Sequence, residues 1–398
     1  MISGQGSVSV AVSRLREKNA RLSGIESLRG YAAFAIMCFH VVWIGKIDPP
    51  EILRFIKWNF GFAVPLFFVV SAFSLAYSYQ RNLRSARDVQ AYFVKRFARI
   101  APLFYAVLAF QLLRMWLADT SLPSWTQLII NVTFLFNLVP GWSEGIVHAS
   151  WSIGVEMMFY LLFPFLAEQL STRSLCGLLG ISLVLAASFS AAMTSFGNSG
   201  AFYAAHHFIV MLPYFVIGLI SFRTYKTLLS RSTENLIRGT RRYATYLFCL
   251  AFGIILFLYH GTSILLAFTN AGQRVIWDAL WGIPFGMLCI AMALWPPLIL
   301  SNRVTEHLGK ISFSFYLVHP FIVESLAESG LYELAKTSLG STENPVATLG
   351  VAILVTGCLV TLAATLAFQL IEIPGMNWGR RTSRNDLPLG AAGCENRN

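Results

Sequence analysis

Apolar runs of about 20 residues recur along the whole chain, separated by short segments that hold most of the charged residues. A run of that length is what an α-helix needs to cross the hydrocarbon core of a bilayer. The pattern therefore predicts an all-α, polytopic membrane protein with about ten transmembrane helices. Their expected limits are roughly 28–45, 59–79, 98–117, 149–167, 174–194, 203–222, 243–261, 276–299, 311–329 and 346–370.

A further apolar stretch at 127–140 is too short for a crossing, and we expect a partly buried or interfacial helix there. With the N-terminus in the cytoplasm, the predicted inside segments hold roughly four times as many Lys and Arg residues as the outside segments. Counting 127–140 as a crossing would move the basic loop between Arg223 and Arg242 outside and remove this asymmetry. We therefore expect both termini in the cytoplasm and a multi-pass protein of the cell inner membrane.

Composition excludes an ordinary soluble domain, because 56% of the 398 residues are hydrophobic and only 12% are charged. The net charge of +11 is better explained by membrane topology and anionic lipid than by nucleic acid. The six cysteines form no CxxC pair, which argues against a disulfide framework or a metal site. We expect a cytoplasmic N-terminal segment at 1–24 without a signal peptide, one membrane domain at 25–372, and a short, mobile cytoplasmic tail at 373–398.

Two ionisable residues lie in the first apolar run, where charged groups are costly. Arg29 and His40 are eleven positions apart, so they share one helix face at an axial separation of about 16 Å. Glu156 lies in the fourth run. Because the first and fourth helices run in opposite directions, we expect Glu156 and His40 at a comparable depth in the membrane. A carboxylate there could fix the tautomer of His40 and raise its basicity, as a general base requires. The alternative is that Glu156 pairs with an arginine only to hold the helices together.

Other polar residues allow two interpretations each. Ser71, beside Ala72, fits close helix packing better than chemistry. Arg96 and Arg99 share a face at the cytoplasmic mouth of the third helix, where they suit either a phosphorylated ligand or lipid headgroups.

The ninth helix has a polar stripe of its own. Ser312, Tyr316 and His319 follow helical spacing, and His319 precedes Pro320, whose ring frees a backbone carbonyl. A hydrogen bond from His319 to such a carbonyl is as good an explanation as catalysis. His206 and His207 are interpreted as interfacial or packing residues.

Five short motifs occur in a fixed order along the chain. Arg29 and His40 form Arg-x10-His, and residues 67–73 read Phe-Phe-x-x-Ser-Ala-Phe. The others are Arg-x-x-Arg with Ile-x-Pro at 96–102, Trp-Ser-Ile-x-x-Glu-x-x-Phe-Tyr at 151–160, and Gly-x-x-Ser-x-x-x-Tyr-Leu-x-His at 309–319. Together they resemble acyltransferase family 3, the bacterial integral-membrane O-acyltransferases, over about residues 22–372. Ala72 replaces the family's usual glycine, and Ile153 its leucine.

The resemblance implies an acyl-CoA donor, most simply acetyl-CoA, bound from the cytoplasmic side. The acceptor would be a hydroxyl of a surface or exported glycan, such as exopolysaccharide or O-antigen, of a lipid-linked oligosaccharide, or of a small secreted metabolite, and no further cofactor is implied. Some family members carry an extracytoplasmic hydrolase-like domain after the membrane region. We do not find one in this sequence, and we therefore expect either direct transfer or a separate extracytoplasmic partner protein.

The resemblance also suggests roles for individual residues. His40 would be the general base, oriented by Glu156 or another acid, although His319 is a second candidate for the base. Arg29 would orient His40 or bind the donor. The remaining candidates are Arg96 and Arg99 for the donor's phosphates, and Ser71, Tyr316 and His319 for the channel wall or the oxyanion.

Two rival classes explain part of the pattern. A transporter or flippase for a glycan or lipid-linked substrate would also have about ten helices and buried ionisable groups. Such proteins often have Gly- or Pro-broken helices at matching positions in two halves, and we do not see that arrangement. A binding or sensor module would keep the fold without the chemistry. The intact set of ionisable motif residues argues against it.

Overall fold

The computed structural model describes residues 22–79, 83, 85–166, 171–231, 236–266, 271–339 and 344–385. Within these ranges the regular secondary structure is helical. Among the described residues, eight helices are long and apolar enough to cross a membrane. Two more of the ten predicted crossings are shorter helices, α7 with 16 residues and α15 with 17. The prediction of an all-α polytopic membrane protein is confirmed.

The elements of the first half are α2 (Ser23–Ile44), η1 (Glu51–Leu53), α3 (Arg54–Asn59), η2 (Phe60–Phe62), α4 (Ala63–Tyr79), α5 (Ala86–Leu117), α6 (Trp125–Val132), η3 (Phe136–Leu138), α7 (Trp151–Leu166) and α8 (Thr172–Thr194). Those of the second half are α9 (Gly197–Ala205), α10 (Phe208–Arg231), α11 (Leu236–Leu266), α12 (Ala271–Leu280), α13 (Gly282–Leu294), α14 (Arg303–Lys310), α15 (Ser312–Glu328), α16 (Leu331–Leu339), α17 (Pro345–Ala367), η4 (Phe368–Glu372) and α18 (Ile373–Asn385).

Several limits differ from the sequence-based prediction. The third span begins twelve residues early, at Ala86, because Ser85 and Asp88 form a capping box that starts the helix there. Arg96 and Arg99 therefore lie inside α5 and not at its mouth. The sixth span is interrupted at His206 and His207, between α9 and α10. As predicted, the 127–140 stretch does not cross, because α6 has only eight residues.

The expectation of a mobile polar tail from residue 373 is wrong for its first part. After a π-helical segment, η4, the chain continues as α18 and packs on α5. A Cβ added at Gly375 would come within 2.7 Å of the Ala98 carbonyl oxygen, so the two helices approach closely here. Residues 1–21 and 386–398, which hold most of the predicted N-terminal segment and the end of the tail, lie outside the described residues.

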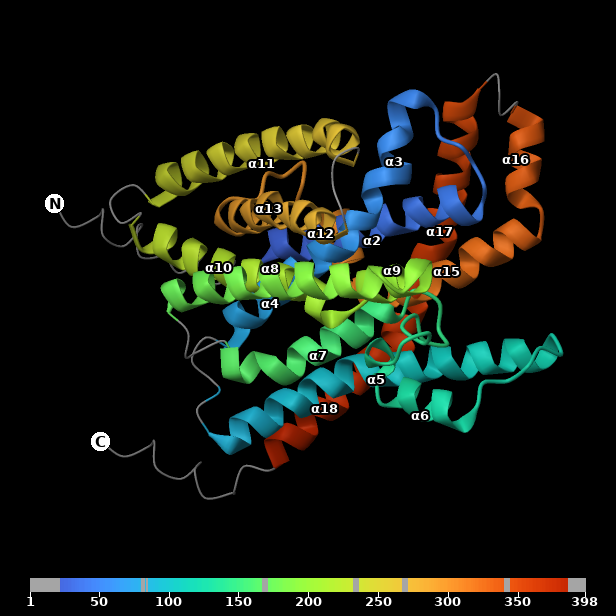
Figure 1. The fold of residues 1–398 in the computed structure, drawn as a ribbon, viewed down its shortest axis with the longest axis horizontal. Coiled ribbons are helices and arrows are strands. Elements are labelled where there is room, and N and C mark those ends of the chain that lie inside the picture. The colour runs from blue at the N-terminus through green and yellow to red at the C-terminus, as the bar shows by residue number, and fades with distance from the viewer. Residues whose placement is uncertain are drawn as a thin grey trace, which may run out of the picture.

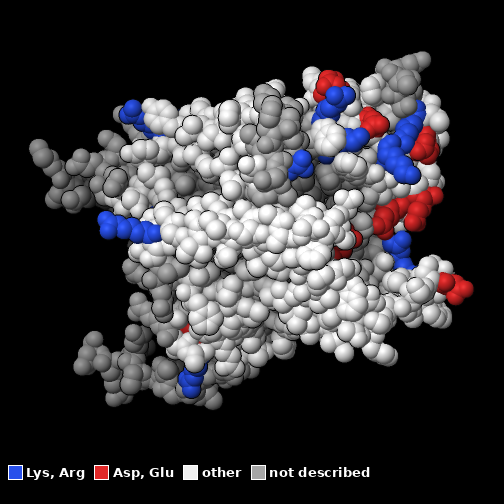
Figure 2. All heavy atoms as spheres, in the orientation of Figure 1, with Lys and Arg blue, Asp and Glu red and all other residues white. Residues whose placement is uncertain are grey.

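Most helices run side by side along the long axis of the molecule, with α2 in their midst (Figure 1). The short helices α3 and α16 both lie toward the same end of the molecule. Figure 2 shows charged side chains gathered mainly at the two ends of the molecule, with a broad uncharged band between them. Exposed apolar side chains such as Leu250, Phe257 and Leu362 fit contact with lipid in such a band. The end that carries α3 and α16 is the one that the charge pattern assigns to the outside.

Small residues set the closest helix contacts. A Cβ at Gly309 in α14 would lie 1.9 Å from the Glu26 carbonyl oxygen of α2. In the second motif, Ala72 is fully buried and faces Gly218 of α10, where an added Cβ would come within 2.7 Å of the Ala72 methyl group. The alanine that replaces the motif's glycine therefore packs against a glycine on the neighbouring helix.

Candidate active site

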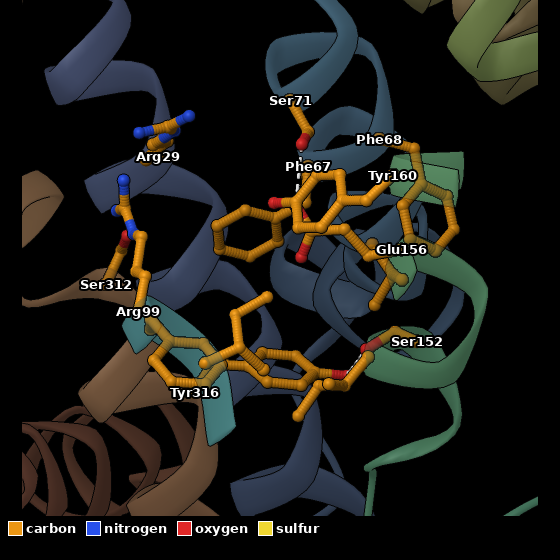
Figure 3. A pocket seen from close by; sticks show the side chains of 14 residues that line it. Arg29, Phe67, Phe68, Ser71, Arg99, Ser152, Glu156, Tyr160, Ser312 and Tyr316 are labelled. Carbon is orange, nitrogen blue, oxygen red and sulfur yellow. Dashed lines mark hydrogen bonds between the residues drawn. The ribbon is translucent and has the colours of Figure 1, made fainter. Parts of the chain in front are cut away.

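A pocket lies among α2, α4, α5, α7 and α15 (Figure 3). Its walls combine two arginines, one carboxylate and several hydroxyl groups with aromatic rings. The residues that line it are Arg29, Val64, Phe67, Phe68, Ser71, Arg99, Ile100, Ser152, Ile153, Glu156, Tyr160, Ser312, Phe313 and Tyr316. The pocket thus brings together members of all five sequence motifs.

The two arginines of the pocket differ in their partners. The Arg99 guanidinium lies 3.9 Å from the buried carboxylate of Glu372, measured from Nε to Oε1, and Ser314 donates a hydrogen bond to the other oxygen of that carboxylate. Arg29 makes no hydrogen bond or ion pair within the described part of the chain. An unpaired guanidinium in a pocket of an apolar protein is costly unless an anion binds there. Arg29 and Arg99 are therefore the candidate residues for binding an anion in this pocket.

Arg96 does not share this pocket, although it shares a helix with Arg99. Its Nη2 donates to the Tyr79 hydroxyl at 3.3 Å, and its guanidinium lies 5.3–6.0 Å from the ring centroids of Tyr79, Tyr92 and Tyr160. This cage of tyrosines holds Arg96 by cation–π contact. The structure thus separates two residues that sequence reasoning had grouped as one phosphate clamp.

Glu156 lies with Ser71 and Tyr160, and it is not among the residues that contact His40. Both hydroxyls donate to its Oε1 atom at 2.5 Å. The predicted pairing of Glu156 with His40 is therefore not seen in the described contacts. The arrangement instead ties α7 to α4, and it leaves the carboxylate facing the pocket (Figure 3).

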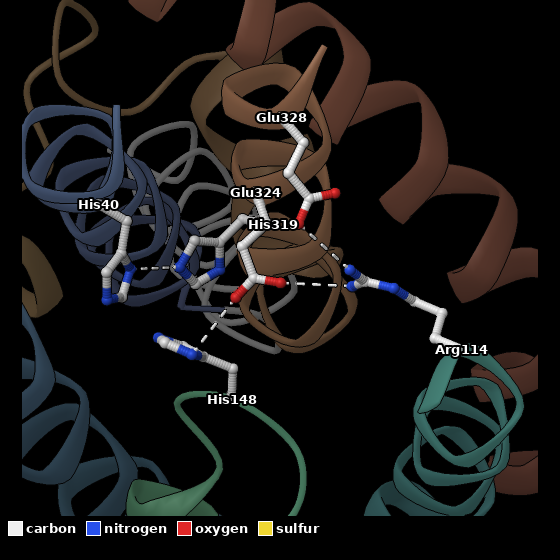
Figure 4. A network of polar contacts seen from close by, with 6 residues as sticks. All are labelled: His40, Arg114, His148, His319, Glu324 and Glu328. Atoms are coloured by element: carbon white, nitrogen blue, oxygen red, sulfur yellow. Dashed lines mark hydrogen bonds and ion pairs between the residues drawn. The ribbon is translucent and has the colours of Figure 1, made fainter. Parts of the chain in front are cut away.

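His40 pairs with another histidine. Its Nδ1 lies 2.8 Å from His319 Nε2, and His319 Nδ1 lies 3.3 Å from the Phe315 carbonyl oxygen one turn earlier in α15 (Figure 4). A carbonyl can only accept, so His319 Nδ1 carries the proton. With both rings neutral, His319 Nε2 then accepts from His40 Nδ1–H, which leaves the lone pair of His40 on Nε2. His319 therefore fits both explanations offered for it. It forms a hydrogen bond to a backbone carbonyl, and it also contacts His40.

Tyr316 separates the pocket from the histidine pair. Its ring lines the pocket and lies 5.6 Å from the His319 ring. Its hydroxyl donates to the Ala149 carbonyl oxygen at 2.9 Å and accepts from Ser152 Oγ at 2.8 Å. Of the predicted polar stripe on α15, Ser312 and Tyr316 line the pocket, and His319 lies beyond them.

A family comparison accounts for this set of residues. The model of a family described as an acyltransferase domain, acyltransferase family 3, matches residues 22–368. The chain belongs to this family. It is a membrane acyltransferase, and the five motifs that meet in and around the pocket are the ones that resemble that family.

Two relatives of this acyltransferase also have names that refer to acyl transfer. An acetyltransferase of Acidianus two-tailed virus, ORF330, whose name is provisional, is 25% identical over 318 residues, which is 77% of this chain and 85% of that protein. Acyltransferase MdmB of Streptomyces mycarofaciens is 29% identical over 153 residues, 36% of this chain and 38% of that protein. No solved structure matches the chain.

Sequence reasoning missed several polar residues near the acyltransferase site. His148 precedes α7 in a loop, and its Nδ1 lies 3.4 Å from Glu324 Oε1. Arg114, near the end of α5, lies 3.3 Å from Glu324 Oε2 and 3.9 Å from Glu328. Glu372, next to Arg99, stands within an apolar run, which is the signal that could have identified it. His148 and Glu324 lie outside the motifs, and nothing in their local sequence points to His40.

The two histidines of the sixth span are packing residues, as predicted. His206 Nδ1 donates to the Phe202 carbonyl oxygen at 2.7 Å, and its ring stands edge-on to Trp151. His207 is buried, and its Nδ1 accepts from the backbone N–H of Ile209 at the start of α10. Both side chains stabilise the break between α9 and α10.

Proposed function

We propose that this enzyme moves an acyl group, most simply acetyl, from a cytoplasmic acyl-CoA to a hydroxyl of a surface or exported glycan in the cytoplasmic membrane. The unpaired Arg29 facing Arg99 in the pocket is the observation that carries the proposal, because it calls for an anionic ligand. The diphosphate of coenzyme A is such an anion, and guanidinium groups bind phosphate strongly.

The distance from this anion site to His40 suits the shape of the donor. Arg29 and His40 are eleven residues apart on α2, an axial rise of about 16 Å. An extended pantetheine arm is of similar length, so phosphates bound at Arg29 would bring the thioester to the level of His40. The arm would pass the ring of Tyr316, whose hydroxyl proton is already donated to the Ala149 carbonyl oxygen and so is not free for the oxyanion. Ser71, on the pocket wall, would line the path of the arm.

In the proposed reaction, His40 Nε2 removes the proton of the acceptor hydroxyl. The acceptor oxygen forms a bond to the thioester carbonyl carbon, and the C–S bond then breaks. Coenzyme A leaves as a thiolate and takes up the proton held by His40, so that an ester and a free thiol are the products. His319 would keep the reactive lone pair on Nε2 of His40, the role that a carboxylate has in other histidine-dependent acyl transfer.

The experiment supplies purified enzyme in nanodiscs with radiolabelled acetyl-CoA and glycan extracted from the surface of the expressing cells. We expect release of free coenzyme A and labelled acetyl ester on the glycan. A transporter or flippase of the same fold would leave the thioester intact, and intact thioester in the presence of bound coenzyme A would contradict the proposal.

A further inference from the structure

A polar cluster at the outer end of the molecule faces His40 from outside the pocket. It consists of His148, Arg114, Glu324 and Glu328 (Figure 4). The His148 ring stands edge-on to the His40 ring, with 5.8 Å between the ring centroids. The His148 side chain is 44% exposed, so the cluster is open to the outer solvent.

The loop that carries His148 is held in a particular shape. Ala149 has a φ of +61°, in the left-handed region that side chains other than glycine rarely adopt. Its carbonyl oxygen accepts from the Tyr316 hydroxyl, and the Ser150 hydroxyl donates to the Glu144 carbonyl oxygen. Unfavourable backbone geometry that the surroundings enforce is often found where a side chain must be aimed. Here it directs His148 to the histidine pair.

Glu324 determines which nitrogen of His148 is free. The Glu324 carboxylate lies 3.4 Å from His148 Nδ1, and when the ring is neutral this contact favours the proton on Nδ1 and the lone pair on Nε2. Arg114 stabilises the carboxylate from the other side. Figure 4 shows the unengaged ring nitrogens of His40 and His148 turned to the same space. Two neighbouring hydrogen-bond acceptors in an outward-facing site match two neighbouring hydroxyl groups.

We propose that His148, Glu324 and Arg114 form the acceptor subsite, which binds a sugar by a hydroxyl next to the one that reacts at His40. This inference rests on the proposed function, since it assumes hydroxyl acylation. Neighbouring hydroxyls are the chemical feature that distinguishes a sugar from a simple alcohol. An aromatic row beside His40 adds a face for the sugar ring, with ring centroids 5.4 Å apart for Phe39 and His40 and 6.1 Å apart for Phe39 and Trp43.

The test compares two acceptors with the same alkyl chain, octyl glucoside and 1-octanol, with labelled acetyl-CoA as donor. We expect the wild-type enzyme to acetylate the glucoside in preference to octanol. His148→Phe keeps the ring volume and removes the nitrogen, and it should lower that preference about tenfold, the effect of one lost hydrogen bond in a binding site. Glu324→Gln should lower it less, because an amide oxygen still accepts from Nδ1.

Arg54→Gln is the matched control, since Arg54 is an exposed residue at the same end and pairs only with Glu51 in the described contacts. It should leave the preference unchanged. An unaltered preference in both His148→Phe and Glu324→Gln would overturn the inference. A wild-type enzyme that hydrolyses acetyl-CoA but shows no preference for the glucoside would do the same. Failure of the wild-type enzyme to cleave acetyl-CoA at all would instead contradict the proposed function.

Discussion

His40 Nδ1 and His319 Nε2 lie 2.8 Å apart, and the outer nitrogen of His319 faces the Phe315 carbonyl oxygen. This chain of contacts orients His40 without a carboxylate. A neutral imidazole ring and a backbone carbonyl fix the tautomer of His40, a role that a buried carboxylate has in other proteins. This arrangement avoids the energetic cost of placing an ion in the membrane. The geometry favours His40, and not His319, as the base, because both nitrogens of His319 are engaged.

His319→Phe should therefore lower acyl transfer strongly, because the ring of His40 loses the acceptor that fixes its tautomer. A wrong tautomer lowers turnover by up to about 10⁴-fold in a serine protease. His319→Gln offers an amide oxygen in place of Nε2, and it should retain more activity than His319→Phe. The measurement is the rate of labelled ester formation at saturating acetyl-CoA. Equal rates for the two variants would mean that His319 acts only by its volume.

Arg29→Gln and Arg99→Gln should each raise the apparent KM for acetyl-CoA about 10- to 100-fold, the effect of losing a charge-assisted hydrogen bond. Arg96→Gln is the matched comparison on the same helix as Arg99. Because its guanidinium is enclosed by tyrosines, we expect it to lower thermal stability and to change the donor KM little. A larger KM effect at Arg96 than at Arg29 would contradict the assignment of the anion site.

Gly309→Ala should destabilise the protein, because the new methyl group would collide with the Glu26 backbone where α14 meets α2. Overpacking of a tight contact typically costs about 1–3 kcal/mol. Gly177→Ala is the control, since no atom beyond its own local backbone lies within 4 Å of an added Cβ. The measurement is the thermal unfolding midpoint in detergent, and a midpoint for Gly309→Ala no lower than for Gly177→Ala would show that the helices can separate at little cost.

The sequence predicted the helical class and the positions of the long apolar helices, because bilayer thickness demands long apolar runs that are easy to recognise. It failed at helix limits such as Ala86 and at the continuation into α18, where polar residues form helices outside the apolar runs. For the site, position along the helices placed Arg29 and Glu156 within the apolar runs, and both side chains line the pocket. Depth along a helix does not tell which way a side chain points around the helix axis. The predicted pairing of Glu156 with His40 therefore failed, because Glu156 points to Ser71 and Tyr160.

Contacts made by loops were beyond sequence reasoning for a related reason. His148 reaches His40 through a turn with a left-handed residue at Ala149, and no periodic pattern encodes such a turn. Likewise, Arg96 and Arg99 both lie in α5 but have different surroundings. Tyrosines of three different helices enclose Arg96 and not Arg99. Both features depend on tertiary packing.

The central claim is that His40 is the base in acyl transfer from acyl-CoA. The most direct measurement compares wild-type enzyme and His40→Gln for two quantities, equilibrium binding of coenzyme A and the single-turnover rate of labelled acetyl transfer. We predict unchanged coenzyme A binding and a loss of transfer of about 10²–10⁴-fold, the usual contribution of a general base. Wild-type transfer by His40→Gln would contradict the account.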